Sequence, residues 1–318
     1  MESSSEYESA KCTAVFAGTP EFAVASLREL HRHPKVDVVA VYTQPDRRAG
    51  RGRRRQLSPV KQTALDLRIP VYQPTNFKDP KDISVFAAHG ADLFVVAAYG
   101  LLLPRSIIEA PRLAINVHAS LLPRWRGAAP IQRCILANDQ QSGISMMRIV
   151  EELDAGPVLS QQACAITPIE TAGSLHDKLA ELGALCLRNT IDAYLTNRLS
   201  EVVQDESQVT YAKKITADDR PIGWSNSADA LERQIRALNP SPAATCNLGS
   251  LSVKIISALA LTDAGIGQAG EIIAANHSGI DVGTGDGVLR ITRLQPQGKK
   301  AMDAKDFVNG FKNSLLPS

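Results

Sequence analysis

The amino-acid sequence predicts an α/β protein with two domains, a doubly wound α/β domain followed by a small antiparallel β-barrel. Three observations support this fold class. The chain has 318 residues, roughly twice the size of a typical domain. Over residues 13–165 short apolar runs alternate with amphipathic stretches, as in parallel strands joined by crossover helices. After Asn239-Pro240 short strand candidates alternate with turns, which favours a barrel of about 100 residues.

The first domain is predicted from its apolar runs and its helix starts. The predicted strands lie at 14–17, 36–42, 93–98, 113–117 and 144–149. Helices are expected to begin at Pro20, Pro59, Asp79, Arg105 and Ala129, and a long helix is expected at 174–194. Thr19 precedes Pro20, so we expect its hydroxyl to cap a helix with proline in the first position. The ligand should bind at the carboxyl ends of the strands, near the reversal of strand order.

The second domain is predicted from a helix and four short strands. The helix begins at Ser227 and ends at Asn239-Pro240, and the strands lie at 251–258, 271–275, 280–282 and 288–294. Before the helix, residues 199–216 are aperiodic and are expected to form a linker. These patterns divide the chain into a disordered tail at 1–10, an α/β domain at 11–198, the linker, and a β-rich domain at 217–318.

Composition excludes several classes of protein. Hydrophobic residues make up 44% of the chain and charged residues 21%, which is typical of a globular protein. Apolar runs are too short for a membrane span, which needs about 20 residues, and the acidic N-terminus does not resemble a secretory signal. Five scattered cysteines without a C-x-x-C pair favour reduced thiols, a cytoplasmic protein and no zinc. Gly18-Thr-Pro lacks the G-x-G-x-x-G spacing of a nicotinamide site.

The most basic segment of the chain follows the second predicted strand. The net charge of the chain is only +2, but residues 46–55 hold six arginines and one aspartate. Gly50 and Gly52 keep this segment from forming a rigid helix. A flexible arginine-rich loop suits phosphates, because a guanidinium can bind phosphate bidentately; the alternative is a solvated loop without a partner. Its place after a parallel strand favours an anionic partner for Arg47, Arg48, Arg51, Arg53, Arg54 and Arg55.

Polar residues with catalytic chemistry follow two later strands. Asn116 and His118 are two residues apart at a strand end, so their side chains point the same way. An amide can donate to a developing oxyanion, and an imidazole titrates near neutral pH. Asp154 lies in a turn that would carry a carboxylate over the same crevice. A structural histidine and ordinary turn chemistry at Asp154 are the alternatives.

Three motifs together resemble the signature of the folate-dependent formyltransferases: Asn116-x-His118, Ser120-Leu-Leu-Pro123 and Leu153-Asp154-x-Gly156. Further segments are similar to the branch of this family that formylates methionyl-tRNA. They lie at 16–23, 44–47, 50–52, 58–61, 98–101, 118–132 and 294–302. The resemblance extends over nearly the whole chain. It implies a Rossmann-like catalytic domain at 11–198 and an OB-fold-like, tRNA-binding barrel at 217–318.

The resemblance also implies a reaction and its residues. Formyl would pass from 10-formyltetrahydrofolate to the methionine amine of initiator methionyl-tRNA, with no metal. The family's catalytic residues fall on Asn116, His118 and Asp154: the first two would stabilise the oxyanion, and Asp154 would keep His118 charged and relay a proton. The folate contacts fall on Ser120, Leu121, Leu122 and Pro123. The loop that enters the tRNA acceptor end falls on the arginine-rich segment. The oligomeric state cannot be read from the sequence, and a monomer is the default expectation.

Other functions remain open from the sequence. A formyltransferase with a small amine acceptor, such as a glycinamide ribonucleotide or an amino sugar nucleotide, would share the same three catalytic residues. A hydrolase on the same core would use water in place of the amine. An RNA-binding module without catalysis would use the basic loop and the barrel, but would not need an imidazole and a carboxylate beside an amide donor.

Overall fold

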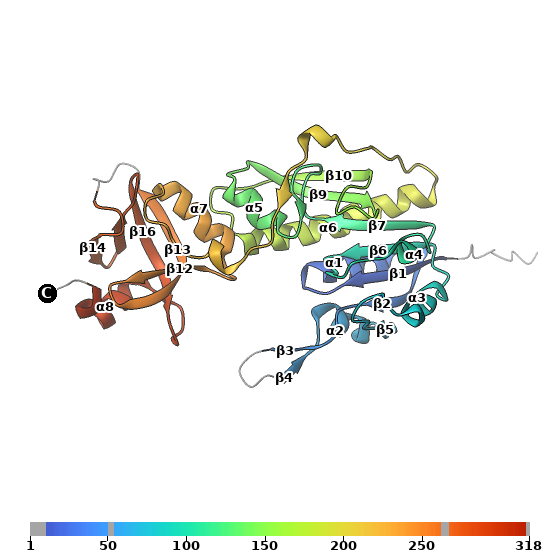
Figure 1. Cartoon of the computed structure of the whole chain (residues 1–318), viewed down its shortest axis with the longest axis horizontal. Helices are drawn as coiled ribbons and strands as arrows, with labels where there is room; N and C mark the ends of the chain where they lie inside the picture. Colours follow the sequence, from blue (N-terminus) through green and yellow to red (C-terminus); the bar gives the residue numbers. More distant parts are fainter. Residues whose placement is uncertain (1–10, 50–53, 262–266, 316–318) are drawn as a thin grey trace, which may run out of the picture. The chain divides into compact units, whose positions relative to one another are not determined.

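The computed structural model describes residues 11–49, 54–261 and 267–315 (Figure 1). The chain forms two compact units and crosses between them several times. The first unit gathers residues up to Gly127 together with Gly143–Cys164 and Asp177–Tyr211. The second gathers Ala128–Ser142, Ala165–His176 and the chain from Ala212 onward. Residues 199–211, part of the predicted linker, therefore pack with the first unit.

A seven-stranded sheet, in the order β10-β9-β7-β6-β1-β2-β5, is the centre of the first unit. Its strands are β1 Cys12–Gly18, β2 Val36–Tyr42, β5 Val71–Tyr72, β6 Leu93–Ala97, β7 Leu113–His118, β9 Gln141–Arg148 and β10 Val158–Ala165. Strand order reverses between β1 and β6, and the pairs from β7 to β5 are parallel. The predicted strands of this domain are confirmed, and β5 and β10 were missed.

One strand runs in a direction that the sequence prediction had wrong. The strand predicted at 144–149 was expected to be parallel, but β9 pairs antiparallel with β7, with Asn116 opposite Met147 and His118 opposite Ser145. An apolar run is buried equally well in either direction, so periodicity does not encode the sense of a strand. The sheet is consequently mixed, with the parallel part dominant.

The helices associated with this sheet begin near the predicted positions. They are α1 Phe22–Arg32, α2 Pro59–Asp66, α3 Pro80–Ala87, α4 Arg105–Ile108 and α6 Ala172–Leu195. Ser58 caps α2, since its hydroxyl accepts from the Lys61 N–H at 3.0 Å, and Asp79 caps α3 in the same manner. The cap predicted at Thr19 is wrong. Its hydroxyl donates instead to the Tyr99 carbonyl at 3.0 Å, which ties the end of β1 to the loop after β6.

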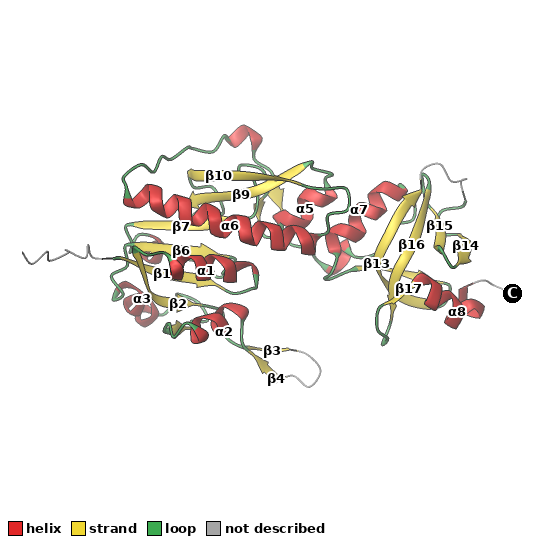
Figure 2. Cartoon of the chain, turned by 180° about the vertical axis from the view of Figure 1, so that it is seen from behind, coloured by secondary structure: helices red, strands yellow, loops and turns green. Residues whose placement is uncertain are grey.

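Helix α6 covers one face of the sheet and thereby decides which face remains for a ligand. Gly183 of α6 lies against Val117 of β7 and Ile144 of β9, and Figure 2 shows α6 running across these strands. Side chains alternate along a strand, so Asn116 and His118 project from the opposite face. No helix in the described ranges is both long and apolar enough to cross a membrane.

The second unit is built on an antiparallel sheet in the order β12-β13-β16-β15-β14, with β17 paired to β16. Its strands are β12 Ala244–Leu248, β13 Leu251–Leu261, β14 Ile272–Asn276, β15 Gly279–Gly283, β16 Val288–Pro296 and β17 Met302–Asp303. Its helices are α5 Pro130–Leu136, α7 Ala228–Leu238 and α8 Ala304–Leu315. The antiparallel C-terminal fold is confirmed, as is the start of α7 at its cap Ser227. Strands β12 and β17 and helix α8 were missed.

Candidate active site

The predicted residues of β7 occupy one face of that strand. His118, at the last position of β7, is 6% exposed. Asn116, two residues earlier in the strand, is partly exposed. Alternation along the strand places both side chains on the face opposite to α6. The carboxyl end of β7 therefore presents an amide and an imidazole side by side.

The structure brings Asp154 to these two side chains. Asn116 Nδ2 donates to Asp154 Oδ1 at 3.3 Å, and His118 Nδ1 lies 3.6 Å from Asp154 Oδ2. The same Oδ2 accepts from the Gly127 backbone N–H at 2.8 Å. The Asp154 side chain is only 11% exposed, so these partners satisfy most of a nearly buried carboxylate. All three predicted catalytic residues thus meet in one contact network.

The hydrogen bonds of His118 fix one of its protons. Its Nε2 lies 2.9 Å from the Trp125 carbonyl. A carbonyl oxygen can only accept, so Nε2 carries a proton. The Nδ1 atom is left to face Asp154, 3.6 Å from its Oδ2. Trp125 adopts a left-handed backbone with φ of 67°, which places its carbonyl in this contact.

The turn that carries Asp154 is held by residues that the sequence did not single out. Asp154 has a left-handed φ of 51°. Gln204 donates to the carbonyls of Asp154 and Gly156, at 2.8 and 2.7 Å, and accepts from Arg126 Nε at 3.0 Å. Gln204 lies in an aperiodic stretch, so no pattern in the sequence indicates its role. Arg126 lies within the segment 118–132 that resembles the family, but no role was predicted for it.

The segment predicted to contact folate is mostly buried. Ser120 is 1% and Leu122 is 5% exposed. Ser120 donates to the Arg124 carbonyl at 2.6 Å, and Ser145 ties this loop to β9 by donating to the Ser120 carbonyl at 2.7 Å and accepting from the Leu122 N–H at 3.0 Å. The side chains of Leu121 and Pro123 retain more exposed surface. They are the members of this segment that remain available to a ligand.

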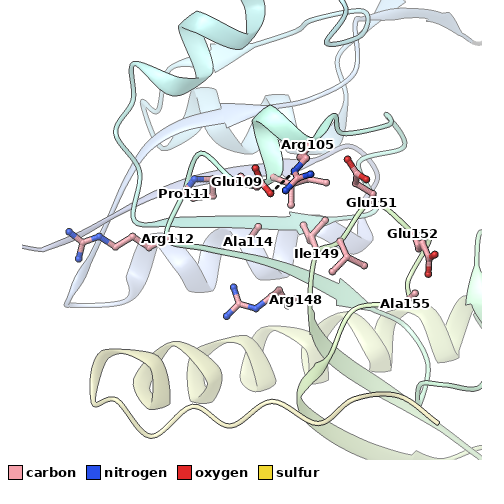
Figure 3. A pocket seen from close by; sticks show the side chains of 12 residues that line it. Arg105, Glu109, Pro111, Arg112, Ala114, Arg148, Ile149, Glu151, Glu152 and Ala155 are labelled. Atoms are coloured by element: carbon pink, nitrogen blue, oxygen red, sulfur yellow. Dashed lines mark hydrogen bonds and ion pairs between the residues drawn. The ribbon is translucent and has the colours of Figure 1, made fainter. Parts of the chain in front are cut away.

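A groove of about 580 Å³ adjoins Asp154 (Figure 3). Its apolar lining includes Ala114, which precedes Asn116 by two residues on the same face of β7, and Ala155, next to Asp154. Figure 3 shows Ile149 between α4 and the loop that carries Glu151 and Glu152. On α4, Arg105 Nε pairs with Glu109 at 2.7 Å. The groove therefore combines an apolar floor with a charged rim. Its lining residues are Arg105, Ile108, Glu109, Pro111, Arg112, Ala114, Arg148, Ile149, Val150, Glu151, Glu152 and Ala155.

The two ends of the arginine-rich segment pair with each other as the strands of a β-hairpin. Strands β3 Arg47–Ala49 and β4 Arg54–Gln56 pair antiparallel, so the backbone of Arg47, Arg48, Arg54 and Arg55 is more regular than the flexible loop that was predicted. Glycines disfavour a helix, but they do not prevent backbone hydrogen bonds between the two antiparallel strands, and these bonds order the ends of the segment. Arg51 and Arg53 lie outside the described residues.

The base of this hairpin is anchored to the first unit. Lys61 Nζ donates to both carboxylate oxygens of Asp46, at 2.9 and 2.8 Å, and to Gln73 Oε1 at 2.6 Å. Gln73 in turn donates to the Gln44 carbonyl at 2.8 Å. The Lys61 and Asp46 side chains are 17% and 18% exposed. The chain on either side of the hairpin is therefore fixed.

The described residues were searched for side chains that could together hold a metal ion. Over residues 11–49, 54–261 and 267–315, no group of three or more His, Cys, Asp or Glu side chains is placed to hold a metal ion. The polar groups around Asp154 instead satisfy one another by hydrogen bonds. Asn116, His118 and Asp154 do not line the groove itself, which reaches them only through Ala155, the neighbour of Asp154. The arrangement offers an amide donor and an imidazole–carboxylate pair at the carboxyl end of β7.

Comparisons with known proteins are consistent with this chemistry. A formyl transferase family model matches residues 11–191, and a model of the C-terminal domain of formyl transferases matches residues 214–312. Methionyl-tRNA formyltransferase of Methylococcus capsulatus is 49% identical over 298 residues, 93% of this chain and 96% of that relative. The enzyme of the same name from Marinobacter nauticus is 45% identical over 304 residues, 95% of this chain and 97% of that relative.

Solved structures share the fold at low identity. HypX from Aquifex aeolicus, in complex with tetrahydrofolic acid, is 15% identical with a TM-score of 0.63, over 96% of this chain and 48% of that chain. The sugar 3N-formyl transferase WlaRD is 19% identical with a TM-score of 0.64, over 91% of this chain and 99% of that one. From the family models and the full-length relatives, we conclude that this chain belongs to the formyl transferase family, and within it to the methionyl-tRNA formyltransferases.

Proposed function

We propose that this chain transfers the formyl group of 10-formyltetrahydrofolate to the amine of methionine on initiator methionyl-tRNA. The observation that carries the proposal is that Asn116 and His118 both meet Asp154, with Asn116 Nδ2 3.3 Å from its Oδ1 and His118 Nδ1 3.6 Å from its Oδ2. The near full-length relatives named methionyl-tRNA formyltransferase support the choice of acceptor.

The reaction needs a donor where negative charge develops. When the amine attacks the formyl carbon, the carbonyl oxygen becomes an oxyanion, and a donor already in place stabilises it without reorganisation. Asn116 Nδ2 is such a donor, and its 3.3 Å bond to Asp154 is long enough to be exchanged readily for a substrate oxygen. Loss of one such donor typically costs about 2.7 to 4 kcal/mol of transition-state stabilisation.

His118 and Asp154 would act on the attacking amine, which must lose a proton when it is formylated. The Trp125 carbonyl holds the Nε2 proton, so Nδ1 is the ring atom that faces the Asp154 carboxylate and the site. Asp154, held by the Gly127 N–H, accepts the amine proton directly or through water. As the tetrahedral intermediate collapses, the bond from the formyl carbon to N10 of the folate breaks and that proton passes to N10, which leaves tetrahydrofolate and the formylated amine.

The groove beside Asp154 is the proposed site of the folate ring. Its apolar floor suits a flat heterocycle, and its backbone and charged rim suit the polar edge of the ring. We propose that Leu121 and Pro123 also contact the folate, while Ser120 and Leu122 keep this loop in shape through Ser145.

The arginine-rich hairpin is the proposed tRNA contact of the first unit. We propose that Arg47, Arg48, Arg51, Arg53, Arg54 and Arg55 bind phosphates of the acceptor stem, because a segment with six arginines and a fixed base suits a polyanion. We further propose a catalytic domain at 11–198, a linker at 199–216 and a tRNA-binding domain at 217–318, working as a cytoplasmic monomer.

The catalytic assignment is tested by single-turnover formyl transfer with saturating donor and charged initiator tRNA. We expect Asn116→Ala and Asp154→Ala each to lower the rate by at least about a hundredfold while folate affinity is retained. Asp37→Ala, which alters an exposed aspartate of β2, is the matched control. Rates near that of the unmodified chain in both site variants would exclude these roles.

The acceptor is tested by offering the protein different amines. We incubate it with 10-formyltetrahydrofolate and, in separate reactions, charged initiator tRNA, charged elongator tRNA, a glycinamide ribonucleotide, an amino sugar nucleotide, or no acceptor. Formylation of initiator tRNA alone supports the proposal. Preferred use of a small amine, or release of formate without an acceptor, would instead identify a small-amine transferase or a hydrolase.

The tRNA contact is tested by salt and by charge removal. Arg51→Ala and a neutral replacement of Arg53–Arg55 should raise the KM for tRNA and flatten its dependence on salt, because fewer counterions are released on binding. Folate affinity should be unchanged. A KM for tRNA that does not respond to salt in the unmodified chain contradicts an electrostatic contact.

A further inference from the structure

The segment 202–210, which is part of the predicted linker at 199–216, is fixed to the site from two directions. At its start, Val202 and Val158 exchange backbone hydrogen bonds of 2.8 and 2.9 Å. At its end, the Thr210 carbonyl accepts from the Arg126 N–H and the Thr210 hydroxyl accepts from the Trp125 N–H, both at 2.9 Å. The segment therefore bridges the strand that follows Asp154 and the loop that contacts His118.

Gln204, near the start of this segment, is buried and fully hydrogen-bonded. It is 6% exposed. Its Nε2 donates one hydrogen to the Asp154 carbonyl and the other to the Gly156 carbonyl, at 2.8 and 2.7 Å, and its Oε1 accepts from Arg126 Nε at 3.0 Å. The opposite amide orientation would set an oxygen against two carbonyls and an NH₂ against a guanidinium. The chemistry of its neighbours therefore fixes the orientation of this side chain.

Arg126 holds Gln204 in that orientation and is itself held. Its side chain is 3% exposed. Beside the bond from Nε to Gln204, its terminal nitrogens pair with Glu206, the closest contact being 2.7 Å. Glu206 is 72% exposed, so the far end of this chain of contacts reaches solvent. Its near end reaches the turn of Asp154.

We propose that Gln204 is a positioning residue for Asp154. The two carbonyls that it binds lie on either side of Ala155, so one carboxamide clamps the turn in which Asp154 holds a left-handed φ of 51°. A turn held in this way keeps Asp154 Oδ1 within reach of Asn116 and Asp154 Oδ2 within reach of His118. The proposal rests on the proposed catalytic role of Asp154, and it adds a requirement on a residue that touches none of the reacting atoms.

The test replaces the two donors of Gln204 without changing its size. Gln204→Glu sets an acceptor against two carbonyls, and Gln204→Met removes the polar atoms without adding charge. We expect either variant to lower the single-turnover rate by about tenfold to a hundredfold, since a displacement of about 1 Å of a catalytic group costs on that order. KM values for folate and tRNA should change by less than about threefold. Gln208→Glu is the matched control: it makes the same change at an exposed glutamine of the same segment.

A double-mutant cycle separates positioning from general damage to the fold. If Gln204 acts through Asp154, then Gln204→Met adds no further loss in an Asp154→Ala background. A full further loss in that background, or an unchanged rate in Gln204→Met with intact melting behaviour, overturns the inference. Failure of the proposed catalytic role is distinguishable, because Asp154→Ala alone would then be active. Should Gln204→Glu fold poorly, Gln204→Met in both backgrounds carries the test.

Discussion

Replacing Gly156 by alanine tests how closely the Asp154 turn must be held. A Cβ built on Gly156 would lie 1.8 Å from the Arg148 carbonyl oxygen and 2.9 Å from its carbon. Since real Cβ contacts are essentially never shorter than 3.0 Å, the first of these contacts must open by at least 1.2 Å. Both near atoms belong to the backbone of β9, so no flexible side chain can yield, and the turn itself must move.

We expect this movement of the turn to lower both the single-turnover rate and the free energy of unfolding. A shift of about 1 Å in a catalytic group costs on the order of a hundredfold in rate, and we expect the single-turnover rate of Gly156→Ala to fall by that factor. Overpacking of this kind also costs about 1 to 3 kcal/mol of unfolding free energy. The Gly156 carbonyl would move away from Gln204 in the same step.

The assay measures single-turnover formyl transfer, folate affinity and urea unfolding on the same preparation. Gly310→Ala is the control, because a Cβ there meets nothing within 4 Å and the residue lies in α8 of the second unit. A Gly156→Ala protein that is folded, binds folate and reacts within about threefold of the unmodified rate would refute the reasoning. It would mean that the turn can shift without displacing Asp154 from its partners.

Three further predictions concern other parts of the first and second units. Lys61→Met removes the cation bound to Asp46 and Gln73 and should raise the KM for tRNA at unchanged folate affinity; an unchanged KM contradicts anchoring of the hairpin. Burial raises the pKa of Cys134 from 9.0 to about 12, so its thiolate fraction is about 10³-fold smaller; rapid alkylation of this thiol in the native protein would contradict that. Burial lowers the pKa of His89 below 6.5. The unfolded chain then protonates first as pH falls through 6.5, and stability is lost; His89→Gln should reduce this loss in urea unfolding between about pH 8 and pH 5.

Much of the site follows from local sequence. The spacing of Asn116 and His118 on an apolar run places both on one face of β7, because side chains alternate along any strand. The turn at Asp154 and the helix starts at Ser58 and Ser227 likewise depend on neighbours only a few residues away. The charge of the hairpin is a property of ten consecutive residues, and no fold is needed to see it.

Other features depend on contacts between distant residues, and they required the tertiary structure. The direction of β9 depends on where the chain returns to the sheet, and the hydroxyl of Thr19 found a partner 80 residues away in place of the helix end beside it. The bond from Gln204 to Asp154 spans 50 residues, and that from Arg126 to Gln204 spans 78.

The sequence by itself therefore determined the two-domain α/β architecture, the strands and helices with strong periodicity, and the three polar residues of the site. Only the tertiary structure decided how these residues are held, through the Trp125 carbonyl, the Gly127 N–H and Gln204. The physical reason is that a periodic pattern records which face of an element is buried. A single hydrogen bond between distant segments depends on the path of the whole chain and leaves no pattern at either end.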